Sequence, residues 1–209
     1  IKMKTQKIIE SLQSGRVYMN ELGYFIKEEE QEDDEVWDRI ENQINSSAYE
    51  AQGGIPCNFA LKQENSSNFG FCMFYISNEH AKFQFSDKQK ERLVRFGDTA
   101  LIIKDVGEFI RRATNAASKE GFELHHREVY YYDEKQEVTI EMMDLLTKGM
   151  YNISFFKREK FRHQQEYRLA VNMEKTERDH IELQIGDISD ISVQVSTEQM
   201  LEEGIDIQN

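Results

Sequence analysis

The stretch SFFKREKFRHQQEYRLAV, residues 154–171, contains the change of pattern on which the fold prediction rests. Its first part is charged and shows no alternation, whereas from residue 166 onward polar and apolar side chains alternate, as in a half-buried strand. In such a strand Tyr167 and Leu169 lie on one face, and Glu166 and Arg168 lie on the other. We therefore expect a carboxylate and a guanidinium side by side where a core strand begins.

Two interpretations of this junction remain open. In the first, Glu166 stands at the edge of the sheet, ionised beside neighbouring basic residues and directed at a ligand hydroxyl. Gln164 would point the same way if the extended conformation reaches back two residues. In the second, Glu166 pairs with a local arginine, and the basic residues from Lys157 to Arg162 form an exposed turn. Spacing alone favours the second, because surface ion pairs are common and mostly structural.

The rest of the chain predicts strands and helices in an interspersed order. Helices are expected at residues 4–12, 35–44, 86–97, 105–121, 139–149 and 197–204, and strands at residues 16–20, 57–62, 69–77, 99–104, 123–132, 166–172, 180–186 and 190–196. The strands at 57–62 and 69–77 predict a hairpin closed by a polar loop. Because hairpin-like neighbours outnumber strand-helix-strand units, we predict one α+β domain over residues 1–209, with a mixed, largely antiparallel sheet flanked by helices.

Charge is distributed unevenly along the chain. The formal net charge is -13, and the segment KEEEQEDDEVWDRIE, residues 27–41, holds nine acids and two bases. It predicts an acidic loop and helix inserted around residues 27–46, which are solvated or dock a basic protein partner through Glu28–Glu41. General nucleic-acid binding is not expected, since that affinity comes from Lys and Arg on the phosphates.

Several classes of protein are excluded by what the sequence lacks. No apolar run reaches the roughly 18 residues of a membrane helix, and the first residues do not form a signal peptide, so we expect a cytoplasmic protein. Two cysteines, Cys57 and Cys72, make neither a disulfide framework nor a metal site. Phosphate-binding, dinucleotide-binding, hydrolase and zinc-protease motifs are missing. His125 and His126 are adjacent on a predicted strand and would face opposite sides.

Several short blocks resemble a widespread family of uncharacterised bacterial and phage proteins, some encoded near abortive-infection and other phage-defence genes. The blocks are IIESLQSGRVYMNELGYF, FGFCMFYIS, FSDKQKERLVRFGDTALIIKD and FFKREKFRHQQEYRLAV, which together touch roughly residues 7–172. The last block departs from the family's pattern at Phe161, where a Trp is usual, and at Gln164, where an acid is usual. The resemblance implies a prophage- or defence-associated protein.

A second resemblance concerns chemistry. ADP-ribosyltransferases carry a Gln/Glu-x-Glu step before a strand, and residues 164–166 are similar to it. The resemblance implies that Glu166 hydrogen-bonds the nicotinamide ribose of NAD and that Gln164 orients the acceptor. It also implies that Arg16 holds the NAD phosphates or ribose and that Ser77 orders the site, with Arg168 beside them. NAD would be a substrate, and no resident cofactor or metal is expected.

Two functions follow as alternatives. One is an ADP-ribosyltransferase-like enzyme that uses NAD on a protein or nucleic-acid target. The other is a non-catalytic inhibitor or nucleic-acid mimic, which presents its acidic segment to a basic partner and associates faster through charge. The sequence leaves open which of them holds, as well as the target and the oligomeric state.

Overall fold

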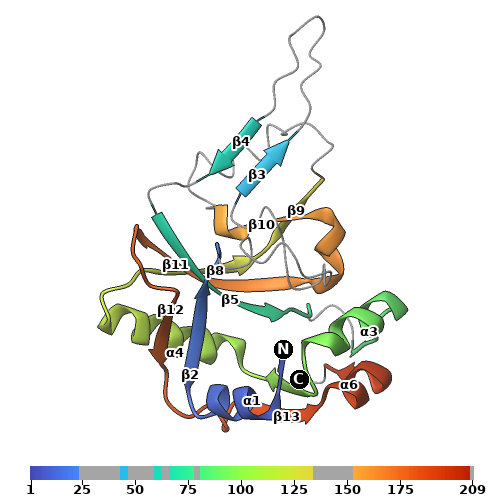
Figure 1. The fold of residues 1–209 in the computed structure, drawn as a ribbon. Coiled ribbons are helices and arrows are strands. Elements are labelled where there is room, and N and C mark those ends of the chain that lie inside the picture. Colours follow the sequence, from blue (N-terminus) through green and yellow to red (C-terminus); the bar gives the residue numbers. More distant parts are fainter. Residues whose placement is uncertain (24–42, 47–58, 63–65, 78–80, 134–152, 208–209) are drawn as a thin grey trace, which may run out of the picture.

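The computed structural model describes residues 1–23, 43–46, 59–62, 66–77, 81–133 and 153–207, and its centre is an antiparallel five-stranded sheet (Figure 1). The strand order is β12-β2-β5-β11-β8. The bounds are β2 (Arg16–Glu21), β5 (Ser66–Phe74), β8 (Leu124–Glu128), β11 (Glu166–Glu174) and β12 (His180–Gln184). The longest pairing joins β11 to β5 from Glu166–Phe74 to Glu174–Ser66, so the strand that the opening stretch predicts runs through the interior of the sheet.

A second sheet packs beside the first. It is antiparallel, with the order β1-β7-β13, and consists of β1 (Lys2–Lys4), β7 (Thr99–Ile103) and β13 (Ser192–Ser196). Three two-stranded pairs complete the sheets: β3 (Gln43–Ser46) with β4 (Phe59–Lys62), β6 (Lys82–Phe83) with β14 (Ile205–Asp206), and β9 (Tyr130–Tyr132) with β10 (Phe156–Arg158). Only β9 and β10 run parallel among the described pairs. The predicted α+β class with mostly antiparallel sheets is confirmed.

Helices begin and end largely where sequence signals predict. The α-helices are α1 (Gln6–Gln13), α3 (Asp87–Leu93), α4 (Val106–Lys119) and α6 (Thr197–Glu203), and the 3-10 helices are η1 (Val94–Phe96), η2 (Ile153–Phe155) and η3 (Glu159–Gln164). Ser86 and Gln89 form a capping box at the start of α3, and the Asp105 carboxylate caps α4 by accepting from the Glu108 N–H at 2.9 Å. No helix in the described ranges is long and apolar enough to cross a membrane.

The main hydrophobic core lies on one face of the five-stranded sheet. Figure 1 shows α4 crossing this face, where it contacts the outer strands β8 and β12. The core includes Phe69, Phe71 and Leu169 from the strands and Phe109 from α4, all buried. A smaller core around Phe74, Phe85 and other residues joins the three-stranded sheet to α3 and α6. Because side chains alternate along each strand, one set lies in this hydrophobic core and the other set lies on the opposite face of the sheet.

Two predictions about strands are corrected by the structure. The predicted hairpin of residues 57–62 and 69–77 is wrong, because β4 pairs with β3 whereas β5 pairs with β2 and β11. The predicted strand over 123–132 is two strands in different sheets, β8 and β9, separated at Val129. Pairing partners lie far apart in sequence, so local alternation could not reveal either change.

Other differences lie at the ends of predicted helices. The helix expected at residues 4–12 begins at Gln6, because Lys4 belongs to the unpredicted strand β1. The helix expected at 35–44 falls mostly outside the described residues, but its last two positions, 43 and 44, are in β3. The helix expected at 139–149 lies wholly outside them.

Candidate functional site

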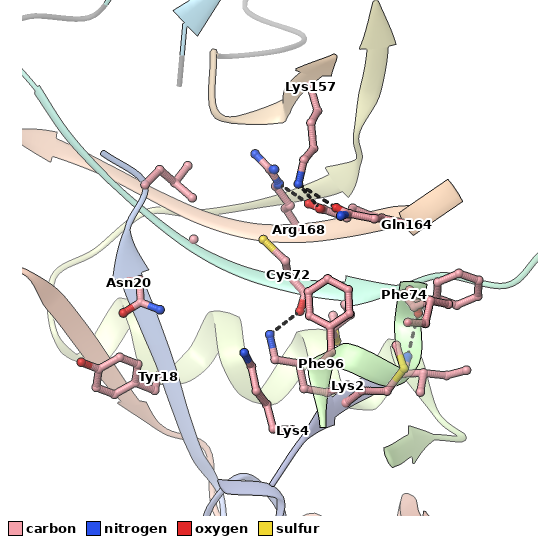
Figure 2. Close-up of a pocket in the computed structure, with 17 residues that line it drawn as sticks. Lys2, Lys4, Tyr18, Asn20, Cys72, Phe74, Phe96, Lys157, Gln164 and Arg168 are labelled. Atoms are coloured by element: carbon pink, nitrogen blue, oxygen red, sulfur yellow. Dashed lines mark hydrogen bonds and ion pairs between the residues drawn. The ribbon is translucent and has the colours of Figure 1, made fainter. Parts of the chain in front are cut away.

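The second face of the five-stranded sheet is polar, and it holds the cavity that we identify as the candidate site. Strands β2 and β5 pair only at Asn20–Gly70 and Glu21–Phe69 and separate beyond these residues. A cavity of about 140 Å³ is lined by both strands, by β1 and by the start of β11 (Figure 2). Its polar lining side chains are Lys2, Lys4, Tyr18, Asn20, Cys72, Lys157, Gln164, Glu166 and Arg168.

The buried end of the cavity is built around one carboxylate. The two oxygens of Glu166 accept from different cations: Oε1 from the Lys157 ammonium and Oε2 from the Arg168 guanidinium, the latter at 2.8 Å. The side chains of Lys157 and Glu166 are each 8% exposed and that of Arg168 is 1% exposed. Predicted neighbours on one strand face, Glu166 and Arg168, are thus in direct contact. The predicted edge position is corrected, since Glu166 begins an interior strand and is buried.

Glu166 is ionised in this environment. Burial opposes its charge, but the positive charges and hydrogen bonds of Arg168 and Lys157 outweigh burial and hold its pKa well below the usual range. An ionised carboxylate offers about four acceptor positions, and these two cations take one on each oxygen. Glu166 can therefore accept a further hydrogen bond, for example from a ligand hydroxyl, but it cannot donate a proton at neutral pH.

Gln164 joins Glu166 by a different backbone route from the one expected. Gln164 ends η3, and Gln165 adopts a left-handed conformation with φ 38° before β11 begins. After this turn both side chains reach the same cation, and the Gln164 Oε1 accepts from the Lys157 Nζ at 2.8 Å. The Gln165 side chain accepts from Gln89 of α3 at 2.6 Å, which anchors the turn. The expectation that Gln164 and Glu166 point the same way depended on an extended chain, and the structure does not have one there; the two side chains meet at Lys157 through the turn at Gln165 instead.

Neighbouring backbone and hydroxyl groups fix the two charged strand residues. The Glu166 N–H donates to the Tyr131 hydroxyl at 2.8 Å, and Arg168 Nη1 donates to the Ser154 carbonyl at 2.6 Å. Burial, followed by the charge of Glu166, raises the pKa of Tyr131. The phenol therefore stays neutral and serves as a hydrogen-bonding support. The exposed basic turn predicted over Lys157–Arg162 is wrong at Lys157, which points into the cavity (Figure 2).

Two lysines from β1 line the cavity on the side away from Lys157. Lys2 Nζ donates to the Cys72 carbonyl at 2.6 Å, and Figure 2 shows Lys4 beside it. Burial lowers the pKa of Lys2 to about 8, assisted by the like charge of Lys4, and burial also lowers the pKa of Lys4. No carboxylate in the described part of the chain forms an ion pair with either lysine. Among the described residues, the cavity lining includes one acid and four basic side chains, within a chain of net charge -13.

Cys72 lines the same cavity. Its side chain is partly buried and lies on the strand face that also presents Arg168, its paired residue on β11. Burial raises the pKa of the thiol, and the Glu166 charge adds to this effect. Cys72 is accordingly a neutral lining group. Cys57 lies outside the described residues.

The structure separates Arg16 and Ser77 from the residues around Glu166. Arg16 shares the polar face but binds Glu182 on β12 through two hydrogen bonds, one of 2.7 Å, and its side chain is 48% exposed. Ser77 lies three residues beyond the end of β5 and is half-buried. Neither lines the cavity. Of the residues predicted for the site, Gln164, Glu166 and Arg168 come together.

The sequence interpretation missed Lys2, Lys4 and Lys157. A signal for the first two exists in the opening residues IKMK, where lysines alternate with Met3 as on a strand with one buried face. Lys157 gave no such signal, since its position depends on the parallel pairing of β10 with β9.

The two adjacent histidines behave as predicted for opposite faces. His126 Nδ1 lies 2.7 Å from the Tyr167 hydroxyl, whereas the His125 imidazole lies 3.8 Å from the Glu123 carboxylate. Neither lines the cavity. In the described ranges, no three His, Cys, Asp or Glu side chains are grouped as metal ligands would be.

Comparisons of the chain with protein-family models, with curated proteins and with solved structures found no match. The predicted relation to prophage and phage-defence proteins stays a prediction. The acidic docking segment Glu28–Glu41 lies outside the described residues and also stays a prediction.

Proposed function

We propose that the cavity is the active site of an ADP-ribosyltransferase-like enzyme that uses NAD. The observation that carries this proposal is an ionised carboxylate, Glu166, held by two buried cations in a cavity whose described lining has four basic side chains and this one acid. In an acidic protein, such a pocket requires that basic residues are concentrated at one place. These residues suit an anionic ligand, and Glu166 suits a ligand that also carries a hydrogen-bond donor.

The size of the cavity indicates which part of NAD enters it. A volume of about 140 Å³ resembles that of engineered cavities that hold one benzene ring. It can enclose the nicotinamide ribose, while the diphosphate stays near the partly exposed side. There Lys4 supplies positive charge without an ion-pair partner in the described part of the chain. Lys4 thus takes the place that the resemblance assigns to Arg16, whose role remains a prediction, as does that of Ser77.

In the proposed reaction the bond between C1 of the ribose and the nicotinamide nitrogen breaks. Nicotinamide leaves with the electron pair, the acceptor atom forms a bond to C1, and the acceptor loses a proton to solvent. Glu166 accepts a hydrogen bond from a ribose hydroxyl and stabilises the positive charge that develops on the sugar. Lys157 and Arg168 hold the carboxylate in place, so that it does not need to reorganise during the reaction.

The test is release of nicotinamide from labelled NAD, with and without a cell lysate as the source of acceptor. We expect Glu166→Gln to slow release by about 100-fold or more, as for other electrostatic contacts in active sites. Glu182→Gln is the matched control, because Glu182 lies on the same sheet face but pairs with the exposed Arg16. Equal release by wild type and Glu166→Gln would contradict the proposal, as would no release by the wild type.

Glu166→Gln leaves two buried cations without their counter-ion, so its folding must be checked by circular dichroism and thermal unfolding. Tyr18→Ala provides a second variant, since Tyr18 lines the cavity but is 40% exposed. We expect weaker NAD binding with little change in the unfolding temperature. Unchanged binding by Tyr18→Ala would place the ligand elsewhere.

A further inference from the structure

Lys2 is an ionisable cavity residue to which the proposed glycosyl transfer gives no chemical role. It lies on β1, the strand that extends the lining where β2 and β5 separate (Figure 2). Its Nζ donates to the Cys72 carbonyl at 2.6 Å and lies 4.6 Å from the centre of the Phe71 ring. The amine is therefore held in one place by a neutral acceptor, and no carboxylate in the described residues forms an ion pair with it.

The charged groups that shift the pKa of Lys2 come from three strands. Lys4 on β1 is a like charge and disfavours the ammonium form, whereas Cys72 on β5 and Glu166 on β11 favour it. Burial is the largest influence, and together these effects lower the pKa of Lys2 to about 8. A lysine buried beside another cation is the usual arrangement for an amine that acts as a nucleophile at neutral pH.

We propose that Lys2 is a carbonyl-reactive amine that forms an imine with small phosphorylated aldehydes entering the cavity. The Nζ lone pair attacks the carbonyl carbon, and the carbonyl oxygen takes up a proton. The nitrogen of the resulting carbinolamine loses its proton, a protonated hydroxyl leaves as water, and a C=N bond forms. The step needs no oxidant, reductant or second substrate.

The cavity selects the class of aldehyde by charge and by size. Lys4, on the same strand as Lys2, supplies positive charge to the cavity and favours a ligand that carries a phosphate. The volume of about 140 Å³ restricts the enclosed part to a group of a few carbons. This inference stands on the position of Lys2 and does not require that NAD is a substrate.

The test is reductive trapping with glyceraldehyde 3-phosphate and cyanoborohydride, followed by mass spectrometry of the peptides. Glyceraldehyde, which lacks the phosphate, is the matched ligand. We expect the Lys2 side chain to be labelled at least about tenfold faster than Lys7, since a pKa of about 8 gives far more neutral amine near pH 7.5 than an ordinary lysine has. Lys7 is the internal reference, because it is exposed on α1.

Three variants make the result decisive. Lys2→Arg keeps the charge and should abolish labelling at position 2, whereas Lys7→Arg should leave it unchanged. Lys4→Gln should reduce the preference for the phosphorylated aldehyde over glyceraldehyde. Labelling of Lys2 and Lys7 at equal rates, or an equal rate for the two aldehydes at Lys2, would overturn the proposal, and circular dichroism of each variant verifies that it is folded.

Discussion

The two faces of the five-stranded sheet differ in what their buried side chains do. On strand β11, Leu169 and Val171 join the hydrophobic core under α4, and both are at most 1% exposed. Glu166 and Arg168 lie on the other face of the same strand; they are almost as deeply buried, but they are charged. The same strand therefore carries an ordinary core on one side and an ionic cluster on the other.

The contrast indicates that burial alone does not explain the polar face. Apolar burial stabilises the fold by roughly 25 cal/mol per Å². Burying an ion pair often contributes no more stability than well-packed apolar residues of the same size would. The stability of the fold alone therefore does not account for three buried charged side chains at the end of a cavity.

The largest effect is expected from removing the shared carboxylate. Glu166→Ala leaves Lys157 and Arg168 buried without a counter-ion and should lower the free energy of unfolding by about 3–5 kcal/mol. Leu169→Ala on the apolar face should lower it by about 2–5 kcal/mol through the cavity it creates. Urea unfolding of both variants gives the two losses in free energy of unfolding, so that the two faces can be compared directly.

Replacing the whole cluster by apolar residues distinguishes the two faces more sharply. We expect the triple variant Lys157→Met, Glu166→Leu, Arg168→Met to be as stable as the wild type, or more stable by about 1–4 kcal/mol, because no charge remains to be desolvated. The same variant should lose NAD binding. A triple variant as unstable as Glu166→Ala would show that the ionic cluster itself stabilises the fold.

Lowering the pH should reduce the free energy of unfolding through the charged side chains of the polar face and not through the apolar core. The pKa of Glu166 is lower in the folded state, so the unfolded state binds more protons in acid. Its contribution is fully present above the ordinary glutamate value of about 4.3 and is lost as the pH falls toward the folded value. Urea unfolding between pH 7 and pH 3 should show a smaller loss in the triple variant than in the wild type, and identical slopes would contradict this assignment.

Raising the pH above neutrality should increase the contribution of Lys2 to the free energy of unfolding. The folded state releases this proton at about pH 8, whereas an ordinary lysine holds it to about 10.5. The unfolded state binds more protons between these values, so the contribution of Lys2 to stability rises with pH across this window. Lys2→Met should flatten the rise, and Lys7→Met, at an exposed site on α1, should not.

The smallest effect is expected at the exposed margin of the polar face. Arg16→Ala removes an ion pair to Glu182 in which the arginine side chain is 48% exposed, so stability should fall by no more than about 1 kcal/mol. A loss of several kcal/mol in thermal or urea unfolding would mean that the exposed pair of Arg16 and Glu182 contributes as much to stability as the buried cluster does. Nicotinamide release by this variant also tests the role that the ADP-ribosyltransferase resemblance assigns to Arg16.

Much of the fold was predictable because it depends on local signals. Alternation predicted β11 and its two faces, and helices were expected to begin at residues 86 and 105, where Ser86 and Asp105 cap α3 and α4. The pairing of β4 and the division of residues 123–132 between two sheets were not predictable, since strand partners are chosen by contacts distant in sequence. The site was predicted in part: Gln164, Glu166 and Arg168 are close in sequence, whereas Lys2, Lys4 and Lys157 join them only through pairing.

The sequence by itself determined that Glu166 and Arg168 share a strand face, because side chains in a strand alternate with a period of two. It also determined the α+β class, through the order and length of its apolar patterns. Only the tertiary structure decided that Glu166 and Arg168 are buried, that a cavity opens where β2 and β5 separate, that Lys157 of β10 binds the carboxylate and that two lysines of β1 line the same cavity. The physical reason is that charge environment and burial depend on neighbours through space, which the spacing of residues along one chain does not specify.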